Sequence, residues 1–185
     1  MRRTILPLYR GEPASLEPAL FVFSELRERS GVAEHTLKRW IDAKVLRPTD
    51  LTLSVGTGGL RRFPVEEVVT AAALAPFAAV ALTLERQGLL ARVFRNALND
   101  RLIGEPASDI EQVHRDLRRA LIRAVCGIGE NLVAVAAVET VYVLAFTDDP
   151  FDLATFRSKT GAPAEAAIVL ADMTARLTGI VDIVD

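Results

Sequence analysis

The sequence is poor in the side chains that build disulfide bonds and metal centres. It has one cysteine, Cys126, and two histidines, His35 and His114, among 185 residues. A single thiol cannot form an internal disulfide bond, which agrees with a reducing compartment, and we expect Cys126 to be buried and unreactive. Three scattered candidate ligands do not make a Cys/His zinc site. We therefore expect no metal ion and no other cofactor.

Long hydrophobic runs are absent as well. No stretch of about 18 uncharged apolar residues occurs, and a transmembrane helix needs roughly that length. The richest stretch, residues 131–146, is interrupted by Glu139. The Met-Arg-Arg start is not followed by the apolar core and small-residue cleavage site of a signal peptide. These absences predict a cytoplasmic protein without membrane contact.

Recognisable catalytic patterns are also missing. No nucleophile–base pair, carboxylate dyad or cofactor loop stands out by its spacing. The stretch CGIGEN, residues 126–131, has two glycines rather than the full dinucleotide-binding pattern, and it follows a predicted helix instead of a strand. The acidic residues Asp148, Asp149 and Asp152 lack the spacing of a calcium loop and indicate a solvated loop. We therefore expect that the protein is not an enzyme.

The charge that is present divides unevenly along the chain. Within a net charge of −2 for the whole chain, residues 21–75 hold eight Lys/Arg and seven Asp/Glu, whereas residues 76–185 hold eleven and fifteen. A weakly basic front and an acidic rear are typical of an anion-binding module joined to a sensing or assembly region.

The front of the chain predicts two short helices after an arm. Residues 1–20 hold three prolines and little periodicity, which indicates the arm. Ser24 is expected to cap a helix that Gly31 ends in the left-handed conformation. A second helix is predicted from Ala33 to Ala43, with Trp40 on its apolar face. Two short helices joined by a Gly turn form a helix-turn-helix.

A hairpin is predicted to follow these helices. Residues 51–55 alternate apolar and polar side chains, as a strand does, and residues 56–59 form a Gly-rich turn. Residues 60–63 would return antiparallel, and Pro64 suits the start of another helix. Residues 21–75 therefore predict a winged helix-turn-helix.

The stretches FSELRERSGVAEHTLKRWIDAKVL and GGLRRFPVEEV together resemble the DNA-binding domain of MerR-type transcription regulators, over about residues 21–75. The features that carry the resemblance are Gly31-Val32, Thr36-Leu37-Lys38, Trp40, Val45-Leu46, Gly59, Arg61 and Phe63. Three positions depart from the family pattern. Ala33 stands where the family favours a helix-capping Ser, Arg39 where it often has Tyr, and Lys44 where it often has Gly.

This architecture predicts which side chains meet DNA. The second helix would enter the major groove, and the wing would meet the backbone. Lys and Arg neutralise phosphates or donate to guanine, Thr contacts a phosphate or a thymine methyl group, and Glu accepts from cytosine. The candidates are Glu34, His35, Thr36, Lys38 and Arg39 on the helix, with Arg61 and Arg62 on the wing.

Each candidate also has a simpler structural interpretation. Glu34 can support the helix start, and His35 can be a solvated helix residue. Arg61 and Arg62 can protect an exposed strand edge; one of them is expected to face the DNA backbone and the other the protein, and the resemblance implies that Arg61 makes the contact. Trp40 is expected to fill the core rather than to stack on a base.

Residues 76–127 predict helices of a linker or dimerisation region. One is expected over residues 79–102 and another from Ser108. In the family, a helix after the winged domain pairs antiparallel with its twin, which implies a homodimer; an ordinary core helix is the alternative. The side chains that recur every four residues in the first of these helices are Leu90, Phe94, Leu98 and Leu102.

Residues 128–185 predict an α+β effector or interaction region. NLVAVAAVETVYVLAF predicts two strands around Glu139, or one bent strand. Asp152 is expected to cap a short helix that ends at Lys159, and residues 166–172 predict a further strand. The last dozen residues fit either a helix or a strand. The fold class predicted for the whole chain is α+β, mainly helical.

Together these patterns predict a transcription regulator of MerR type that binds double-stranded DNA as a homodimer. The family typically distorts promoter DNA and so alters its contacts with RNA polymerase, and the rear region would bind a signal or another protein. The alternative is a protein-interaction adaptor or antitoxin-like partner that holds another protein through its C-terminal half. The adaptor hypothesis predicts an exposed apolar patch on residues 131–185.

Overall fold

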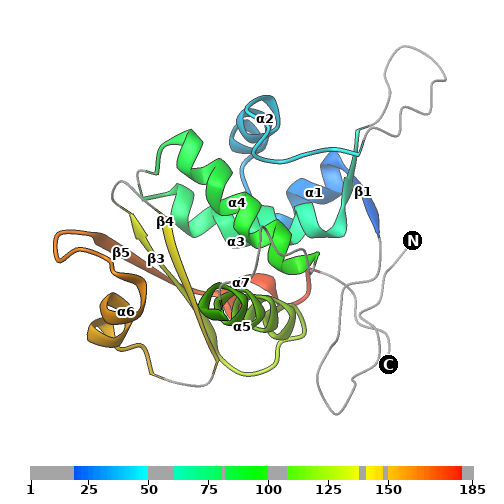
Figure 1. Cartoon of the computed structure of the whole chain (residues 1–185). Coiled ribbons are helices and arrows are strands. Elements are labelled where there is room, and N and C mark those ends of the chain that lie inside the picture. The colour runs from blue at the N-terminus through cyan, green and yellow to red at the C-terminus, as the bar shows by residue number, and fades with distance from the viewer. Residues whose placement is uncertain are drawn as a thin grey trace, which may run out of the picture.

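The computed structural model describes residues 19–49, 61–80, 82–99, 108–137, 141–147 and 150–180. Within these residues the chain is α+β and mainly helical, as the sequence predicts (Figure 1). The helices are α1 (Phe23–Ser30), α2 (Glu34–Asp42), α3 (Val65–Ala78), α4 (Leu84–Leu98), α5 (Ser108–Val125), α6 (Leu153–Thr160) and α7 (Met173–Leu177). The strands are β1 (Leu20–Val22), β2 (Arg62–Pro64), β3 (Asn131–Ala137), β4 (Val141–Thr147) and β5 (Ala167–Asp172). Among the described helices, none has the length and apolarity needed to cross a bilayer.

The helices α1 and α2 form where the sequence predicts them. Gly31 ends α1 with a φ of 65°, the left-handed conformation that glycine adopts at low cost. The prediction that Ser24 caps α1 is wrong, because β1 runs to Val22 and the helix already begins at Phe23. The Glu25 carboxylate instead accepts a hydrogen bond from the Val22 backbone N–H at 2.8 Å. Glu25, in the first turn of α1, thus provides the side-chain hydrogen bond at the N-terminal end of the helix.

The strand before α1 pairs with the strand before α3. β1 and β2 are antiparallel, with Phe21 opposite Phe63. Leu20, which the sequence places in the N-terminal arm, is therefore the first residue of a strand. The return strand predicted over residues 60–63 is observed from Arg62. Residues 51–59, the predicted first strand and turn of the hairpin, lie outside the described residues.

The middle of the chain is divided differently from the prediction. α3 continues through Pro76, so the expected boundary between residues 75 and 76 falls inside a helix. The helix predicted over residues 79–102 is shorter, because the Thr83 hydroxyl accepts from the Arg86 backbone N–H and caps α4 there. Residue 102 lies outside the described part of the chain.

A three-stranded antiparallel sheet with the order β4-β3-β5 forms the rear of the molecule. Two strands, not one bent strand, therefore account for the valine-rich stretch, and β5 confirms the further strand. Side chains alternate between the two faces of the sheet, as strand geometry requires. Val133 and Val135 belong to the core shared with α5, whereas Ala134 and Ala136 pack with Phe156 of α6. Of the last dozen residues, 174–177 belong to the short helix α7, and residues 181–185 lie outside the described part of the chain.

One continuous hydrophobic cluster joins the front and the rear. It runs from Leu37 and Trp40 of α2 through α3 and α4 to Leu121 of α5 and Val133 of β3. A smaller cluster around Phe156 covers the other face of the sheet. Because the front helices share a close-packed core with the middle helices, a shift of one element must be accommodated by its neighbours.

Candidate nucleic-acid interface

The helix α2 presents one buried face and one exposed face. Leu37 and Trp40 are fully buried, as their spacing predicts, and Ile41 packs partly against the same core. The helix begins after Ala33, whose side chain makes no capping hydrogen bond. Its exposed face carries the polar side chains that the sequence singled out, so core packing rather than capping fixes the direction in which that face points.

Glu34 lies at the centre of a small ion network at the start of α2. Its carboxylate contacts Arg27 Nη1 at 3.0 Å and Lys38 Nζ at 2.7 Å. The hydrogen bond and charge of Lys38, and then the hydrogen bond of Arg27, lower the pKa of Glu34 below its ordinary value. The carboxylate is therefore ionised and engaged at neutral pH, which agrees with the structural interpretation of Glu34 as support for the helix start. All three side chains are exposed, so this network is weak and is screened by salt.

The other candidates on α2 remain accessible. His35 and Arg39 are exposed, and Thr36 is half-buried. Their side chains make no hydrogen bond or ion pair within the described residues. Together with Lys38, they give the outer face of α2 two cationic groups and two polar ones.

Arg61 and Arg62 lie at the start of β2 and differ in exposure. Arg61 is exposed and Arg62 is half-buried. The carbonyl oxygen of Arg62 accepts from the Thr49 backbone N–H at 2.8 Å and from the Thr49 hydroxyl at 3.0 Å. These bonds form an antiparallel bridge between Thr49 and Arg62, so the chain leaves and re-enters the described fold at adjacent points.

The structure brings some of the candidate residues together and leaves others separate. Glu34 and Lys38 are in contact, but no hydrogen bond or ion pair in the described chain joins the α2 residues to Arg61 or Arg62. Figure 1 shows α2 and the β1–β2 pair on the part of the molecule away from the three-stranded sheet. The candidates therefore form two groups on the same half of the molecule.

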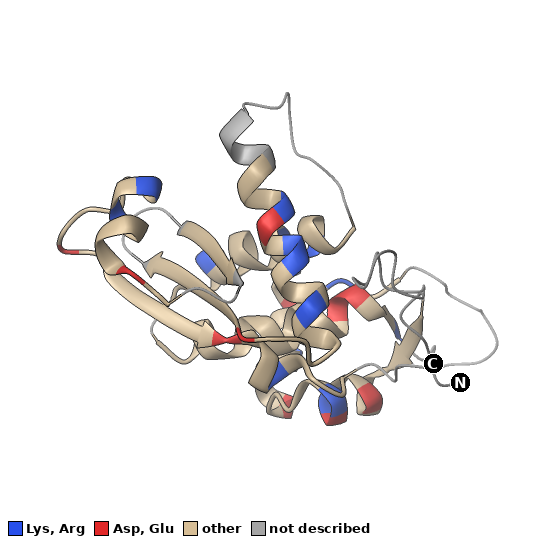
Figure 2. Cartoon of the chain, turned by 90° about the horizontal axis from the view of Figure 1, so that it is seen from below, with Lys and Arg blue, Asp and Glu red and all other residues tan. Residues whose placement is uncertain are grey.

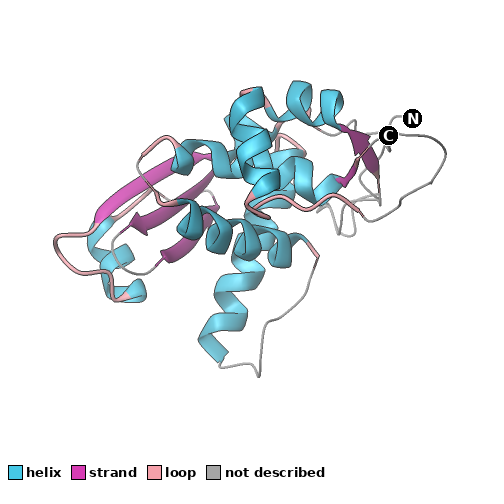
Figure 3. Cartoon of the chain, turned by 90° about the horizontal axis from the view of Figure 1, so that it is seen from above, coloured by secondary structure: helices cyan, strands magenta, loops and turns pink. Residues whose placement is uncertain are grey.

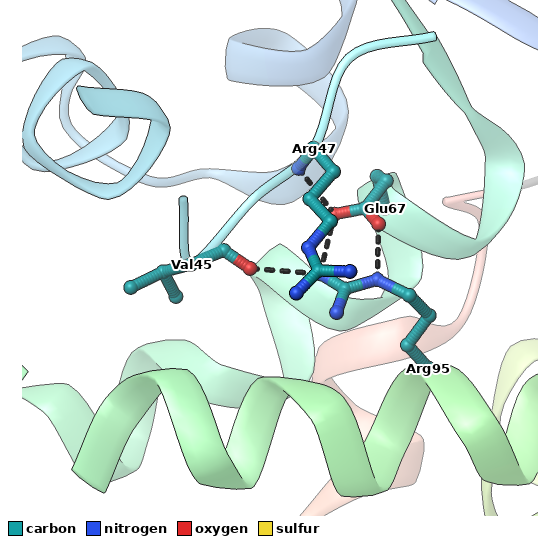
Figure 4. Close-up of polar contacts among 4 residues, drawn as sticks. All are labelled: Val45, Arg47, Glu67 and Arg95. Carbon is teal, nitrogen blue, oxygen red and sulfur yellow. Dashed lines mark hydrogen bonds and ion pairs between the residues drawn. The ribbon is translucent and has the colours of Figure 1, made fainter. Parts of the chain in front are cut away.

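Sequence reasoning missed the polar cluster that underlies this half. Glu67, in the first turn of α3, is almost fully buried with 3% exposure. Its carboxylate accepts from Arg95 Nη2 at 3.0 Å, from Arg95 Nε, and from the Arg47 backbone N–H at 3.1 Å (Figure 4). Glu67 and Arg95 are 28 residues apart, so no local spacing could have identified the pair.

Cationic residues are not confined to the front. Figure 2 shows Lys and Arg along α5, the helix that points upward in that view. These residues lie within the acidic rear of the chain, a local exception that the overall charge count conceals. Each already takes part in an interaction within the chain, so we do not count them in the interface. They are Arg115, Arg118, Arg119 and Arg123.

The thiol of Cys126 is a weak nucleophile at neutral pH. Cys126, which the sequence predicts to be buried, is half-buried and lies just after the end of α5. Burial raises the pKa of its thiol, which keeps it protonated and weakly nucleophilic. Within the described ranges, no group of three or more His, Cys, Asp or Glu side chains is arranged to hold a metal ion.

Comparison of the sequence with protein-family models found no match, and comparison with curated proteins found none.

Proposed function

We propose that this protein is a cytoplasmic, sequence-specific DNA-binding transcription regulator of MerR type that acts as a homodimer. In this proposal α2 enters the major groove and Arg61, with Arg62, contacts the backbone as part of a wing. The observation that carries the proposal is α2 itself, a short helix locked by Leu37 and Trp40 whose outer face carries Lys38 and Arg39. A helix-turn-helix presents its second helix to base edges in this way.

Two backbone features support the helix-turn-helix. Gly31 has a left-handed φ of 65° at the turn between α1 and α2. Lys44 follows α2 with a φ of 58°, the one non-glycine residue with positive φ in the described chain. The family resemblance has glycine at this second position, which is the residue that a left-handed conformation favours. Lys44 therefore adopts a backbone conformation for which glycine is the favoured residue, which supports the resemblance at this position.

The bridge between Thr49 and Arg62 supports the wing. It holds the two ends of residues 50–61 side by side, as the base of a hairpin does. Arg61 stands directly beside this base with an exposed side chain. A guanidinium at this place can neutralise a phosphate, and each such contact steepens the salt dependence of binding.

A homodimer would place two copies of α2 on a pseudo-palindromic operator. The stripe expected to pair with its twin is occupied within the chain, because Leu90, Phe94 and Leu98 of α4 are buried in its own core. The alternative of an ordinary core helix therefore describes α4. Figure 3 shows the N-terminal half of α5 standing away from the body, and we propose this half as the contact with the second copy. Distortion of promoter DNA by such a dimer would alter its contacts with RNA polymerase.

The proposal is tested by fluorescence anisotropy of a labelled duplex from the upstream region of the gene, against a random duplex. The wild type is expected to prefer the upstream duplex at moderate salt. Arg39→Gln and Arg61→Gln should each weaken binding, and Arg61→Gln should lower the slope of log Kd against log salt by about one unit. The matched control is Lys159→Gln, which removes one positive charge from exposed Lys159 on α6, beside the sheet. Equal affinity for both duplexes, or equal effects of all three variants, would contradict the proposal.

The adaptor is a second candidate with an observation in its favour. Leu153 of α6 and Leu170 of β5 are large apolar side chains with 46% and 43% exposure, within residues 131–185. Single exposed apolar residues are common on protein surfaces, so two of them support an interface weakly. A protein that ignores both duplexes but copurifies with a second polypeptide through Leu170 would favour this candidate.

A further inference from the structure

Two buried polar links join α4 to α2 and to the residues that follow it. The first starts at Trp40, whose indole Nε1–H donates to Gln87 Oε1 at 2.7 Å. Gln87 Nε2 in turn donates to the Leu82 carbonyl oxygen at 2.7 Å, so the amide has a fixed orientation. Trp40 and Gln87 have exposures of only 1% and 8%. This link therefore connects the last turn of the proposed recognition helix to the first turn of α4.

The second link is the charged cluster of Figure 4. Arg95, near the end of α4, donates through Nη2 to the Val45 carbonyl oxygen at 2.7 Å and also pairs with Glu67. Glu67 holds the Arg47 backbone N–H, two residues further along. The Arg95 guanidinium thus binds the backbone at Val45, and the Glu67 carboxylate binds it at Arg47. The side chain of Arg95 is 13% exposed, so these bonds are largely shielded from water.

The chain between the two links forms a tight bend. The Trp40 carbonyl oxygen accepts from the Val45 N–H at 2.8 Å and from the Leu46 N–H at 3.2 Å. Lys44 takes its left-handed conformation inside this bend. Because residues 40–46 are closed on themselves by hydrogen bonds, a displacement at Val45 is passed to the end of α2.

Directional bonds of this kind do more than bury surface. A buried ion pair adds little net stability compared with apolar residues of the same volume, and its best-attested role is to specify one arrangement. Hydrogen bonds fix the angle and the register between two elements, whereas apolar side chains tolerate sliding more easily. The two links therefore determine how α2 is held on α4.

We infer that α4 sets the position of the exposed face of α2, with Gln87 and Arg95 as positioning residues. The consequence for DNA affinity rests on the proposed function; the positioning itself does not. α4 also packs against α5, which packs on the sheet, so a partner or ligand that displaces α4 from the rear would change the presentation of Lys38 and Arg39. This assigns to α4 the regulation of the proposed DNA-binding surface.

The test uses Gln87→Met, which keeps the volume of the side chain but removes the acceptor of Trp40 and the donor to Leu82. The control is Phe156→Leu, which loosens the separate cluster beneath α6 at the far end of the molecule. Both variants are studied at a temperature where circular dichroism shows them fully folded. Two readouts are compared: acrylamide quenching of the single tryptophan, Trp40, and Kd for the duplex that the wild type prefers.

Gln87→Met is expected to increase quenching of Trp40 and to weaken duplex binding roughly fivefold or more, the lower end of typical coupling between sites. Phe156→Leu should change neither readout. Unchanged quenching in Gln87→Met would overturn the inference, as would increased quenching with unchanged affinity. If the wild type prefers no duplex, the proposed function fails, and quenching alone then decides whether α4 positions α2.

A charge-matched pair gives an independent check at the second link. Glu67→Gln/Arg95→Met removes both charges together, so that neither is left buried without its partner. We expect this double variant to fold, to bind the duplex more weakly than the wild type and to show increased quenching of Trp40. A folded double variant that equals the wild type in both readouts would show that the Arg95 cluster does not position α2.

Discussion

The helices α2 and α6 are attached to the body of the molecule in different ways. α6 packs through Phe156, whose ring continues a row with Phe151 and Phe146 at centroid separations of 5.9 and 5.5 Å. Its neighbours on the sheet are hydrophobic, among them Ala134, Ala136 and Leu144. α2 also buries an apolar face, but Trp40 and Val45 are joined to α4 by hydrogen bonds between residues 47 and 50 positions apart.

Apolar packing keeps a helix attached to the protein, whereas hydrogen bonds also set its orientation. Apolar contact is nearly non-directional, so the Phe156 cluster holds α6 without defining its angle closely. Within the described residues, the hydrogen bonds that Arg157 of α6 donates reach only the carbonyl oxygens of Pro163 and Ala166, in the chain directly after the helix. Hydrogen bonds depend on angle as well as distance, so the bonds of Trp40 and Arg95 define how α2 is oriented. The proposed DNA-binding surface of α2 needs this kind of definition, because it would have to match the grooves of DNA.

The largest effect is expected for a variant that removes one partner of the ion pair between Glu67 and Arg95. Arg95→Ala leaves the Glu67 carboxylate buried without its partner, which should lower the free energy of unfolding by about 3 to 5 kcal/mol. Urea unfolding followed by circular dichroism measures this change. Glu67→Gln/Arg95→Met should recover much of the loss, because no charge then remains unpaired. A loss below about 1 kcal/mol for Arg95→Ala would contradict the burial of Glu67.

A smaller effect is expected from capping, which differs between the N-terminal ends of α2 and α6. Ala33 precedes α2 and makes no capping hydrogen bond, whereas Asp152 caps α6 through the backbone N–H groups of Ala154 and Thr155. Ala33→Ser should supply the missing acceptor and stabilise the protein by about 1 kcal/mol. The matched control is Ala154→Ser, which adds the same hydroxyl to a helix start that is already capped. The melting temperature should rise for Ala33→Ser only. Equal increases for both variants would contradict this explanation.

The smallest expected effect concerns pH at the cap of α6. The Thr155 hydroxyl and the backbone N–H groups lower the pKa of Asp152 below its ordinary value of 3.8. A carboxylate with a depressed pKa stabilises the fold fully above the ordinary value, and this contribution is lost as pH falls through the depressed one. The difference in melting temperature between the wild type and Asp152→Asn should therefore be largest near neutral pH and shrink below pH 3.8. A difference that stays constant over this range would exclude the carboxylate charge as its source.

Local signals predicted much of the secondary structure. Gly31, the spacing of Leu37 and Trp40, the valine-rich strands and the Asp152 cap each depend on neighbours in the chain, and each is observed. The errors arise where a distant segment competes with a local signal. Ser24 lost its capping role because β1, paired with β2, extends to the residue before the helix.

The candidate interface was predicted only in part for the same reason. Exposed side chains such as Arg39 and Arg61 can be chosen from helix and strand periodicity. The bond between Trp40 and Gln87 spans 47 residues, and the bond between Val45 and Arg95 spans 50. Neither partner carries a motif, and Gln87 lies on a helix whose expected role was pairing with a second copy. The part of the interface that positions α2 was therefore absent from the prediction.

The sequence by itself determined the positions of α1, α2 and the strands β3 to β5, the buried face of α2 and the exposure of Lys38, Arg39 and Arg61, because periodicity, glycine conformation and capping act over a few residues. Only the tertiary structure decided that the apolar stripe of α4 is used within the chain, and that Glu67 and Arg95 meet beneath the bend after α2. Such contacts depend on the angles at which packed elements cross, and small differences in those angles bring together side chains that no local pattern relates.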